Sequence, residues 1–349
     1  MTKTTTCLRT SKCPVVFSLL FLLIFFSFPT FSQNRKEPFN IPATDQKVSG
    51  SHYNEIRLID ARADTIKMGF VQVGMMNTQA EIVFKKPFRD QLSTLMGELT
   101  DATAQKNALY LQLRKFSFSE QTGSFSEIGT FRFRAGLYRK IDEQFVKLNY
   151  LDTVILVKAG AVGDVTKPLM QHAGTEIIDF VQQNLLHDGA VSDSYTLTEI
   201  LNPDSVEKSK IRLYTTTQYT DGLYRSYKAF AAQIPDQGMT VEEKNNEIKS
   251  IRVTDSAGKQ IKVKSRDVYA MVYKGRLYAA TSYDFYLLTK NKGDFYFTGK
   301  VKAGADAMAG AMFGLMGSLL SSSSYYTFEM KIDHISGGFI RIRYIPNPE

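Results

Sequence analysis

The chain has 349 residues, a formal net charge of +8 and no tryptophan, and 43% of its residues are hydrophobic. Its two cysteines, Cys7 and Cys13, both precede Pro14, so the rest of the chain excludes disulfides, thiolate nucleophiles and cysteine-bound metals. Basic residues are spread among acidic ones, a pattern that argues against a nucleic-acid footprint, and we expect no nucleic-acid partner.

The first elements of the chain predict export. An apolar run from Val15 to Phe26 follows three basic residues and precedes Pro29 and the small side chain of Ser32. This order is typical of a secretory signal peptide, here residues 1–32. The alternative is a membrane anchor, but a span needs roughly 20 apolar residues. We therefore expect an extracytoplasmic protein, whether periplasmic, outer-membrane-associated or secreted.

Residues 33–54 are polar, lack periodicity and contain two prolines, which predicts a flexible leader. Residues 55–187 predict an α+β domain, because runs of alternating apolar residues give way twice to apolar stripes at three- and four-residue spacing. The expected strands are 56–59, 68–75, 81–84, 109–113, 131–137 and 145–157, and the expected helices start at Pro87 and Pro168. We expect an antiparallel sheet with both helices on one face.

This order of elements, over residues 67–187, resembles the small α+β modules of envelope lipoproteins that act as auxiliary subunits of transport systems. The resemblance implies a fold and no activity, because function belongs to sites rather than to folds. The chain departs from those proteins in having no cysteine directly after its apolar run.

Residues 188–210 are polar and contain Gly189 and Pro203, which predicts a linker between two domains. Residues 211–349 predict a β-rich second domain. Its expected elements are a strand at 211–215, a short helix capped by Ser226, a charged loop at 236–249, a hairpin at 251–263, and strands at 268–273, 276–281, 283–289, 294–301, 326–332 and 339–344.

Three stretches of this second domain carry another resemblance. They are DGLYRSYKAF from Asp221, DVYAMVYKGRLYAA from Asp267 and YTFEMKIDHISGGFI from Tyr326. Together, over about residues 219–343, they resemble a family of exported bacterial proteins of unknown function. The resemblance implies a β-rich extracytoplasmic domain and assigns no activity and no site residue.

The residue types that carry catalysis or bind metals form no recognisable motif. No two histidines have the three- or four-residue spacing of helix-borne metal ligands, and each is expected as a lone polar residue. Two Ser-x-x-Lys pairs lack the partner motifs of serine acylases. Two pairs of acids could converge in space, although solvated surface acids are the default. These candidates are His52, His172, His187 and His334; Ser205–Lys208 and Ser256–Lys259; and Asp60 with Asp64 and Glu127 with Asp142.

The most unusual stretch is 303–320, in which small residues recur at four-residue spacing. Such a face lets another backbone approach closely. Three interpretations remain open: a Gly/Ala-rich helix buried against the second domain, a segment that contacts a partner or the membrane surface, and a mobile loop. The residues proposed for interaction are Gly310, Phe313, Gly314, Gly317 and Ser318.

The sequence thus favours a non-catalytic exported protein that binds an envelope partner or assists an envelope assembly. It predicts no catalytic residue, no cofactor and no metal, and it leaves the oligomeric state open. A module that binds an apolar ligand is the alternative, and a hydrolase whose residues meet only in the folded chain is the third possibility.

Overall fold

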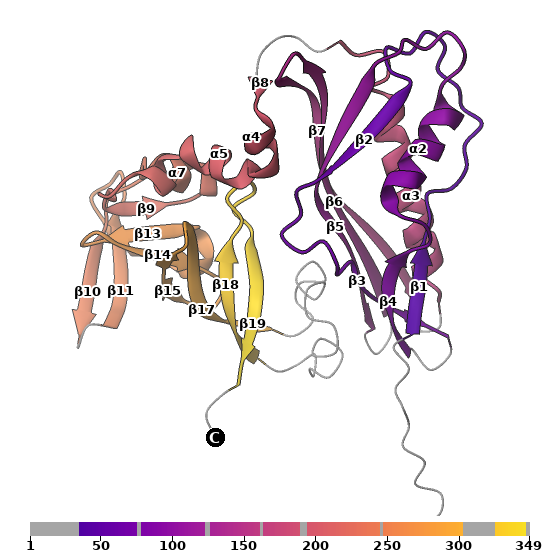
Figure 1. The fold of residues 1–349 in the computed structure, drawn as a ribbon. Helices are drawn as coiled ribbons and strands as arrows, with labels where there is room; N and C mark the ends of the chain where they lie inside the picture. Colours follow the sequence, from indigo (N-terminus) through magenta and orange to yellow (C-terminus); the bar gives the residue numbers. More distant parts are fainter. Residues whose placement is uncertain are drawn as a thin grey trace, which may run out of the picture. The chain divides into compact units, whose positions relative to one another are not determined.

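Strands dominate the computed structural model, which describes residues 35–74, 78–122, 126–160, 163–188, 194–244, 247–302 and 325–346 (Figure 1). These residues belong to one unit that begins at Arg35, and they form an α+β fold rich in strands, as expected. The expected signal peptide, 1–32, and the whole of the unusual stretch 303–320 lie outside the described residues. Both therefore stay predictions.

The first sheet is mixed, with the strand order β1-β4-β3-β5-β6-β7-β8 and with β2 beside β5. Its strands are β1 (Arg35–Phe39), β2 (Glu55–Asp60), β3 (Gly69–Val73), β4 (Thr78–Phe84), β5 (Ala108–Thr122), β6 (Ser126–Ile141), β7 (Gln144–Gly160) and β8 (Ser194–Tyr195). The pairs β1–β4, β2–β5 and β3–β5 are parallel. The expectation of an antiparallel sheet is therefore wrong. Alternation along a strand reports which face is buried and carries no information about the direction of its neighbour.

Helices α2 (Phe88–Leu99) and α3 (Thr166–Gln182) cover one face of this sheet, as expected (Figure 1). Their apolar stripes join the phenylalanines of β5 and β6 in one buried core. The main contributors are Leu92, Leu95 and Leu99 from α2, Leu169, Ile177 and Val181 from α3, and Phe116, Phe118, Phe131 and Phe133 from the sheet. The opposite face of the sheet is free to carry polar side chains.

Residues 35–54 are part of the fold, which corrects the expectation of a flexible leader. Phe39, at the end of β1, is 0% exposed. The backbone N–H of Ile41 donates to the buried side chain of Gln91 at 2.8 Å, and Val48 bridges to Thr100 at the end of α2. The contacts that order this stretch are tertiary, so its lack of local periodicity could not reveal them.

Residues 197–215 contain three short helices, α4 (Leu197–Leu201), α5 (Pro203–Ser209) and α6 (Arg212–Thr215). The expected linker is thus partly helical, and Ile200 of α4 is buried at 1% exposure. The strand expected at 211–215 is wrong. Alternation over so few residues cannot be told from one helical turn. The position of a domain boundary within 188–210 stays a prediction.

The remaining elements are largely those expected, and they form three small sheets, β10-β11-β12, β15-β14-β13-β9 and β16-β17-β18-β19. Their bounds are β9 (Gly222–Tyr224), α7 (Tyr227–Ala232), β10 (Thr240–Lys244), β11 (Glu247–Thr254), β12 (Gln260–Lys262), the 3-10 turn η1 (Ser265–Asp267), β13 (Ala270–Tyr273), β14 (Arg276–Ala280), β15 (Phe285–Leu287), β16 (Thr289–Asn291), β17 (Asp294–Lys302), β18 (Tyr325–Ile332) and β19 (Phe339–Ile345). The cap of α7 is confirmed, because the Ser226 side chain accepts from the N–H of Ala229. The loop expected at 236–249 is wrong, since it contains β10 and the start of β11.

The β17 and β18 strands pack an aromatic core with β9, α7 and β13, and Tyr224, Phe230 and Phe295 are each 0% exposed within it. Among the residues that the structure describes, no helix is long and apolar enough to span a bilayer.

Candidate functional site

A bulge in β5 places two adjacent cations on the polar face of the first sheet. Leu113 pairs with Ala135, and Lys115 pairs with Arg134, so Arg114 is the extra residue. Residues on either side of the bulge, Leu113 and Phe116, both point into the core. Because a bulge shifts the alternation by one position, Arg114 and Lys115 both lie on the face away from α2 and α3.

Arg114 is held by two acids from α5. Its guanidinium donates in a bidentate pair to Glu207, at 2.6 and 2.7 Å, and also to Asp204 at 2.8 Å. The Arg114 side chain is only 5% exposed. Asp204 and Glu207 lie one turn apart on α5, so both carboxylates reach the same guanidinium. Burial alone would lower the Arg114 pKa, but the hydrogen bond and charge of Glu207 outweigh burial and raise it.

Glu207 also joins the network to the loop after β18. His334, which is 4% exposed, lies with its Nε2 2.8 Å from a Glu207 carboxylate oxygen. Burial acts to raise the pKa of Glu207, but the hydrogen bonds from His334 and Arg114 prevail and lower it from 4.5 to about 2. Glu207 is therefore ionised at neutral pH, and its acceptor oxygens are occupied by donors from two distant parts of the chain.

A second ion-pair group lies beside the first. Arg134 of β6 donates from Nη2 to Asp152 and to Asp333, each at 2.8 Å. Burial acts to raise the Asp333 pKa, but the hydrogen bond and charge of Arg134 lower it. Asp333 also accepts from the Ser336 hydroxyl at 3.0 Å, which helps to order the loop between β18 and β19.

A third group ties α5 to the β17–β18 pair. Lys208 and Lys331 both approach Asp294, at 2.7 and 3.1 Å. Burial acts to raise the Asp294 pKa, but the hydrogen bond from Lys208 and the charge of Lys331 lower it. Together the three groups link the polar face of the first sheet, α5 and the β17–β18 pair through ion pairs.

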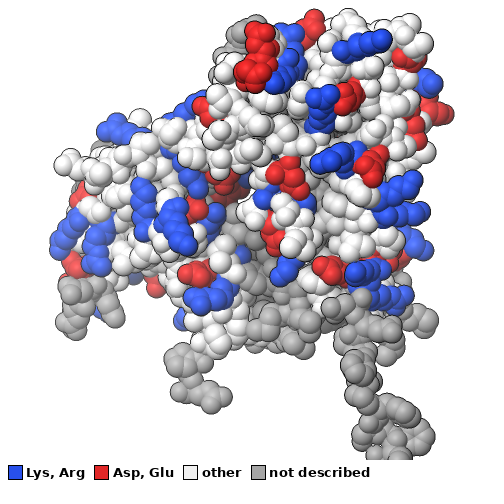
Figure 2. All heavy atoms as spheres, in the orientation of Figure 1, with Lys and Arg blue, Asp and Glu red and all other residues white. Residues whose placement is uncertain are grey.

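A cleft of about 560 Å³ opens between these groups. Its charged lining consists of five cations and one acid, namely Arg114, Lys115, Arg134, Lys208, Lys292 and Asp204, and hydroxyl groups of Ser205, Ser209 and Thr215 also line it. Figure 2 shows basic and acidic side chains interspersed over the face it displays.

Lys115 differs from the arginines of the cleft because no carboxylate in the described part of the chain pairs with its ammonium group. Burial lowers the Lys115 pKa from 10.5, and the charges of Arg132 and Arg134 lower it further. A partly buried, unpaired ammonium among other cations is unfavourable. An anion in the cleft would relieve that strain.

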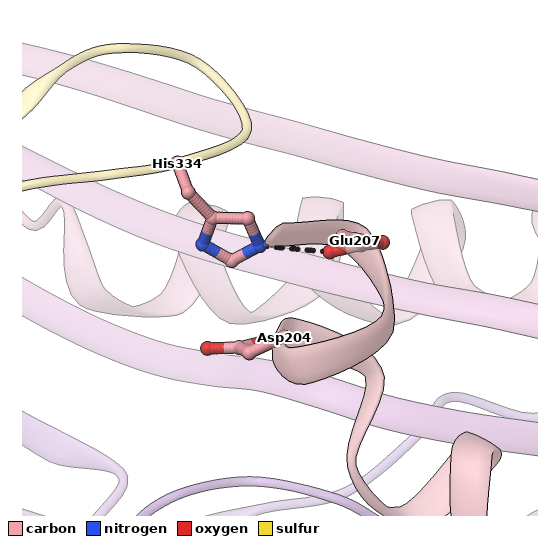
Figure 3. Close-up of side chains that lie close together, drawn as sticks. All are labelled: Asp204, Glu207 and His334. Carbon is pink, nitrogen blue, oxygen red and sulfur yellow. Dashed lines mark hydrogen bonds and ion pairs between the residues drawn. The ribbon is translucent and has the colours of Figure 1, made fainter. Parts of the chain in front are cut away.

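Asp204, Glu207 and His334 form the one group of possible metal ligands found among the described residues (Figure 3). Carboxylate and imidazole are suitable ligands for zinc. However, the Arg114 guanidinium already donates to both carboxylates. A metal cation would therefore be repelled by this buried positive charge, or would have to displace it. The residues fit an ion-pair network and do not fit a metal centre.

The other candidates drawn from the sequence do not converge into a catalytic site. Asp60 binds the Arg62 side chain, whereas Asp64 accepts from the backbone of Ile66 and Lys67. Glu127 and Asp142 lie at opposite ends of β6. The Ser256–Lys259 pair lies in the turn between β11 and β12, and Ser205 and Lys208 line the cleft. His52 pairs with Asp188, His187 lies 3.2 Å from Asn184, and His172 is exposed on α3.

Sequence reasoning singled out Ser205 and Lys208 of the cleft and His334 of its ion-pair network, but it missed the charged residues Arg114, Lys115, Arg134 and Glu207. One signal was available: the apolar positions in LYLQLRKFSF change from odd to even numbers between Leu113 and Phe116, which is the mark of a bulge. That shift would have placed Arg114 and Lys115 on one face. Nothing local could have indicated that Glu207 and His334 meet them. Gly310, Phe313, Gly314, Gly317 and Ser318 lie outside the described residues.

No family model and no curated protein matches this chain. Among solved structures, it is similar to the protein XCC0632 from Xanthomonas campestris, described as DUF330, with 16% identity and a TM-score of 0.26 over 44% of this chain and 93% of that one. It is also similar to an uncharacterised protein, with 8% identity and a TM-score of 0.23 over 43% of this chain and 98% of that one. Likenesses at this level carry no argument about function.

Proposed function

We propose that the chain is an exported, non-catalytic binding protein whose cleft takes a small organic anion bearing phosphate or carboxylate groups. The observation that carries the proposal is the Lys115 ammonium, with which no carboxylate in the described part of the chain pairs, in a cleft where Arg114, Arg134 and Lys208 are already held by acids. The volume of about 560 Å³ falls within the range of small-molecule sites, roughly 300–1,000 Å³. The Lys115 ammonium and the hydroxyls of the cleft lining suit an oxyanion with several acceptors.

The arrangement gives less support to the two other classes of function. A hydrolase using Ser205 would need Lys208 as a base, but the Lys208 ammonium is committed to Asp294 at 2.7 Å. The imidazole of His334 is 4% exposed and lies 2.8 Å from a Glu207 carboxylate oxygen, so a substrate cannot reach it without rearrangement. An apolar ligand would have to desolvate the charges of the cleft without pairing with them.

Calorimetric titration with inorganic pyrophosphate and with citrate, at low ionic strength, tests the proposal. It also shows whether the cleft prefers a phosphate or a carboxylate ligand. We expect at least one probe to bind. Lys115→Met should weaken that binding by about tenfold or more, because a hydrogen bond to a charged group is worth ~1.5–3 kcal/mol. Lys106→Met, at an exposed lysine outside the cleft, is the matched control and should leave binding unchanged. Failure of both probes, or equal binding by the Lys115 variant, refutes the site.

The extracytoplasmic location rests on the apolar run from Val15 to Phe26 and on the small residues that follow it. An envelope partner that delivers or receives the anion is compatible with this location. N-terminal sequencing of the exported protein should start near Gln33. An intact Met1 in a membrane fraction would contradict the proposal of a cleaved signal.

A further inference from the structure

The described strands cover only a small part of the outer edge of β7. β7 pairs with β6 from Gln144 to Gly160, whereas β8 covers its other side only at Phe145 and Val146. In the part of the chain that the structure describes, no strand borders β7 from Tyr150 to Gly160. An uncovered strand edge presents a row of backbone donors and acceptors to another strand.

The two edges of this sheet are unlike each other. β1, at the far edge, is short and carries Arg35, Lys36, Glu37 and Pro38, which are features that block pairing with another chain. β7 has no proline between residues 150 and 160, and its ladder with β6 is regular there. It also exposes two large apolar side chains, Val154 at 36% and Leu156 at 45%. The stretch of β7 from Tyr150 to Gly160 is therefore longer than β1 and lacks its proline, so it can accept another strand.

We propose that the occupant is a second copy of the chain, with β7 paired antiparallel to its counterpart about a two-fold axis at Ile155. This register sets Asp152 opposite Lys158 twice, and Val154 opposite Leu156 twice, all on the same face. Residues directly opposite in an antiparallel pair have Cβ atoms about 4.5–5.5 Å apart, close enough for both kinds of contact. Residues 152–158, DTVILVK, are thus complementary to the same residues of a second chain that runs in the opposite direction.

Other registers lose this complementarity. Moving the axis to Val154 sets Asp152 opposite Leu156, and moving it to Leu156 sets Lys158 opposite Val154. Both arrangements place a charge against an apolar side chain and leave its opposite charge unpaired. Since the hydrophobic pattern selects the register of a strand pair, the axis at Ile155 is the favoured one.

The charges at this edge are available for such contacts. Asp152 accepts from Arg134 through Oδ2, which leaves its Oδ1 for a second donor. Lys158 is exposed, and no acid in the described part of the chain pairs with it. The dimer would join two sheets edge to edge through backbone hydrogen bonds, with the side-chain pairs specifying orientation.

Sedimentation velocity of the purified chain over a range of micromolar concentrations is the first test, and we expect a monomer–dimer equilibrium. Lys158→Glu should weaken self-association by about tenfold or more, because two attractive charge contacts become repulsive. Lys106→Glu makes the same change of charge at an exposed loop residue and should leave the equilibrium unchanged. A chain that is monomeric throughout, or a dimer insensitive to Lys158→Glu, overturns the proposal.

Cysteine pairing tests the register directly, in a background in which Cys7 and Cys13 are serine. A mixture of Val154→Cys and Leu156→Cys chains should form a disulfide-linked dimer on mild oxidation, since a disulfide needs Cβ atoms about 3.5–4.5 Å apart. Each variant alone would place its thiols on a diagonal, about 7–8 Å apart, and should cross-link far less. Equal cross-linking by either variant alone would refute the axis at Ile155.

Discussion

Replacing Glu207 by glutamine keeps the side-chain shape and removes the charge that holds Arg114. The Arg114 side chain is 5% exposed, and only Asp204 would remain as its anion. Breaking a buried ion pair costs ~3–5 kcal/mol. Because Asp204 remains and the Glu207 side chain is 34% exposed, we expect the free energy of unfolding at pH 7 to fall by ~2 kcal/mol.

The same substitution should change the acid sensitivity of the protein. The folded-state pKa of Glu207 is lowered from 4.5 to about 2, so its stabilising contribution is complete above pH 4.5 and disappears as the pH falls toward 2. At about 1.4 kcal/mol per pKa unit the contribution is at most ~3 kcal/mol, and solvent screening reduces it to ~2 kcal/mol. The stabilities of wild type and variant should therefore converge in acid.

Urea unfolding at pH 7, 4.5 and 3 measures both effects. Asp294 and Asp333 also have lowered pKa values and will add to acid unfolding in both proteins, so the difference between the two proteins isolates Glu207. Glu143→Gln is the control, since Glu143 forms a surface pair at 91% exposure and should change stability by less than ~0.5 kcal/mol. A difference that stays constant from pH 7 to pH 3 would refute the reasoning.

Three further predictions concern glycines and can be checked by thermal melts. Gly337→Ala should lower stability by ~2–4 kcal/mol, because the residue has a φ of +74° and a Cβ would lie 2.2 Å from Cγ of Tyr227; an unchanged melt would contradict the placement of the loop after β18. Gly174→Ala should destabilise by ~1–3 kcal/mol, since its Cβ would meet Pro42 at 2.2 Å. Gly97→Ala, with open space around it in α2, should instead stabilise by up to ~1 kcal/mol, and equal effects at the two helical sites would argue against the docking of residues 35–54.

The local sequence pattern was sufficient to predict the helices and strands that have one buried face and one exposed face. The helices that begin near Pro87 and Pro168 and the strands β17, β18 and β19 follow from periods of 3.6 and 2 residues. The cap at Ser226 follows from side-chain chemistry at a helix start. The sequence also indicates the bulge at Arg114, because the alternation of apolar residues changes phase there. These features depend on neighbours within a few positions.

Only the tertiary structure decided the direction of β1 and β2, the docking of residues 35–54, and the meeting of Arg114 with Glu207 and His334. Arg114 and Glu207 are 93 positions apart, and Glu207 and His334 are 127 apart. A strand alternates in the same way beside a parallel or an antiparallel neighbour, and a charged residue has the same local pattern whether it is solvated or paired. Burial and pairing of charges depend on which distant segments the fold brings together, and that is why the cleft became visible only in the folded chain.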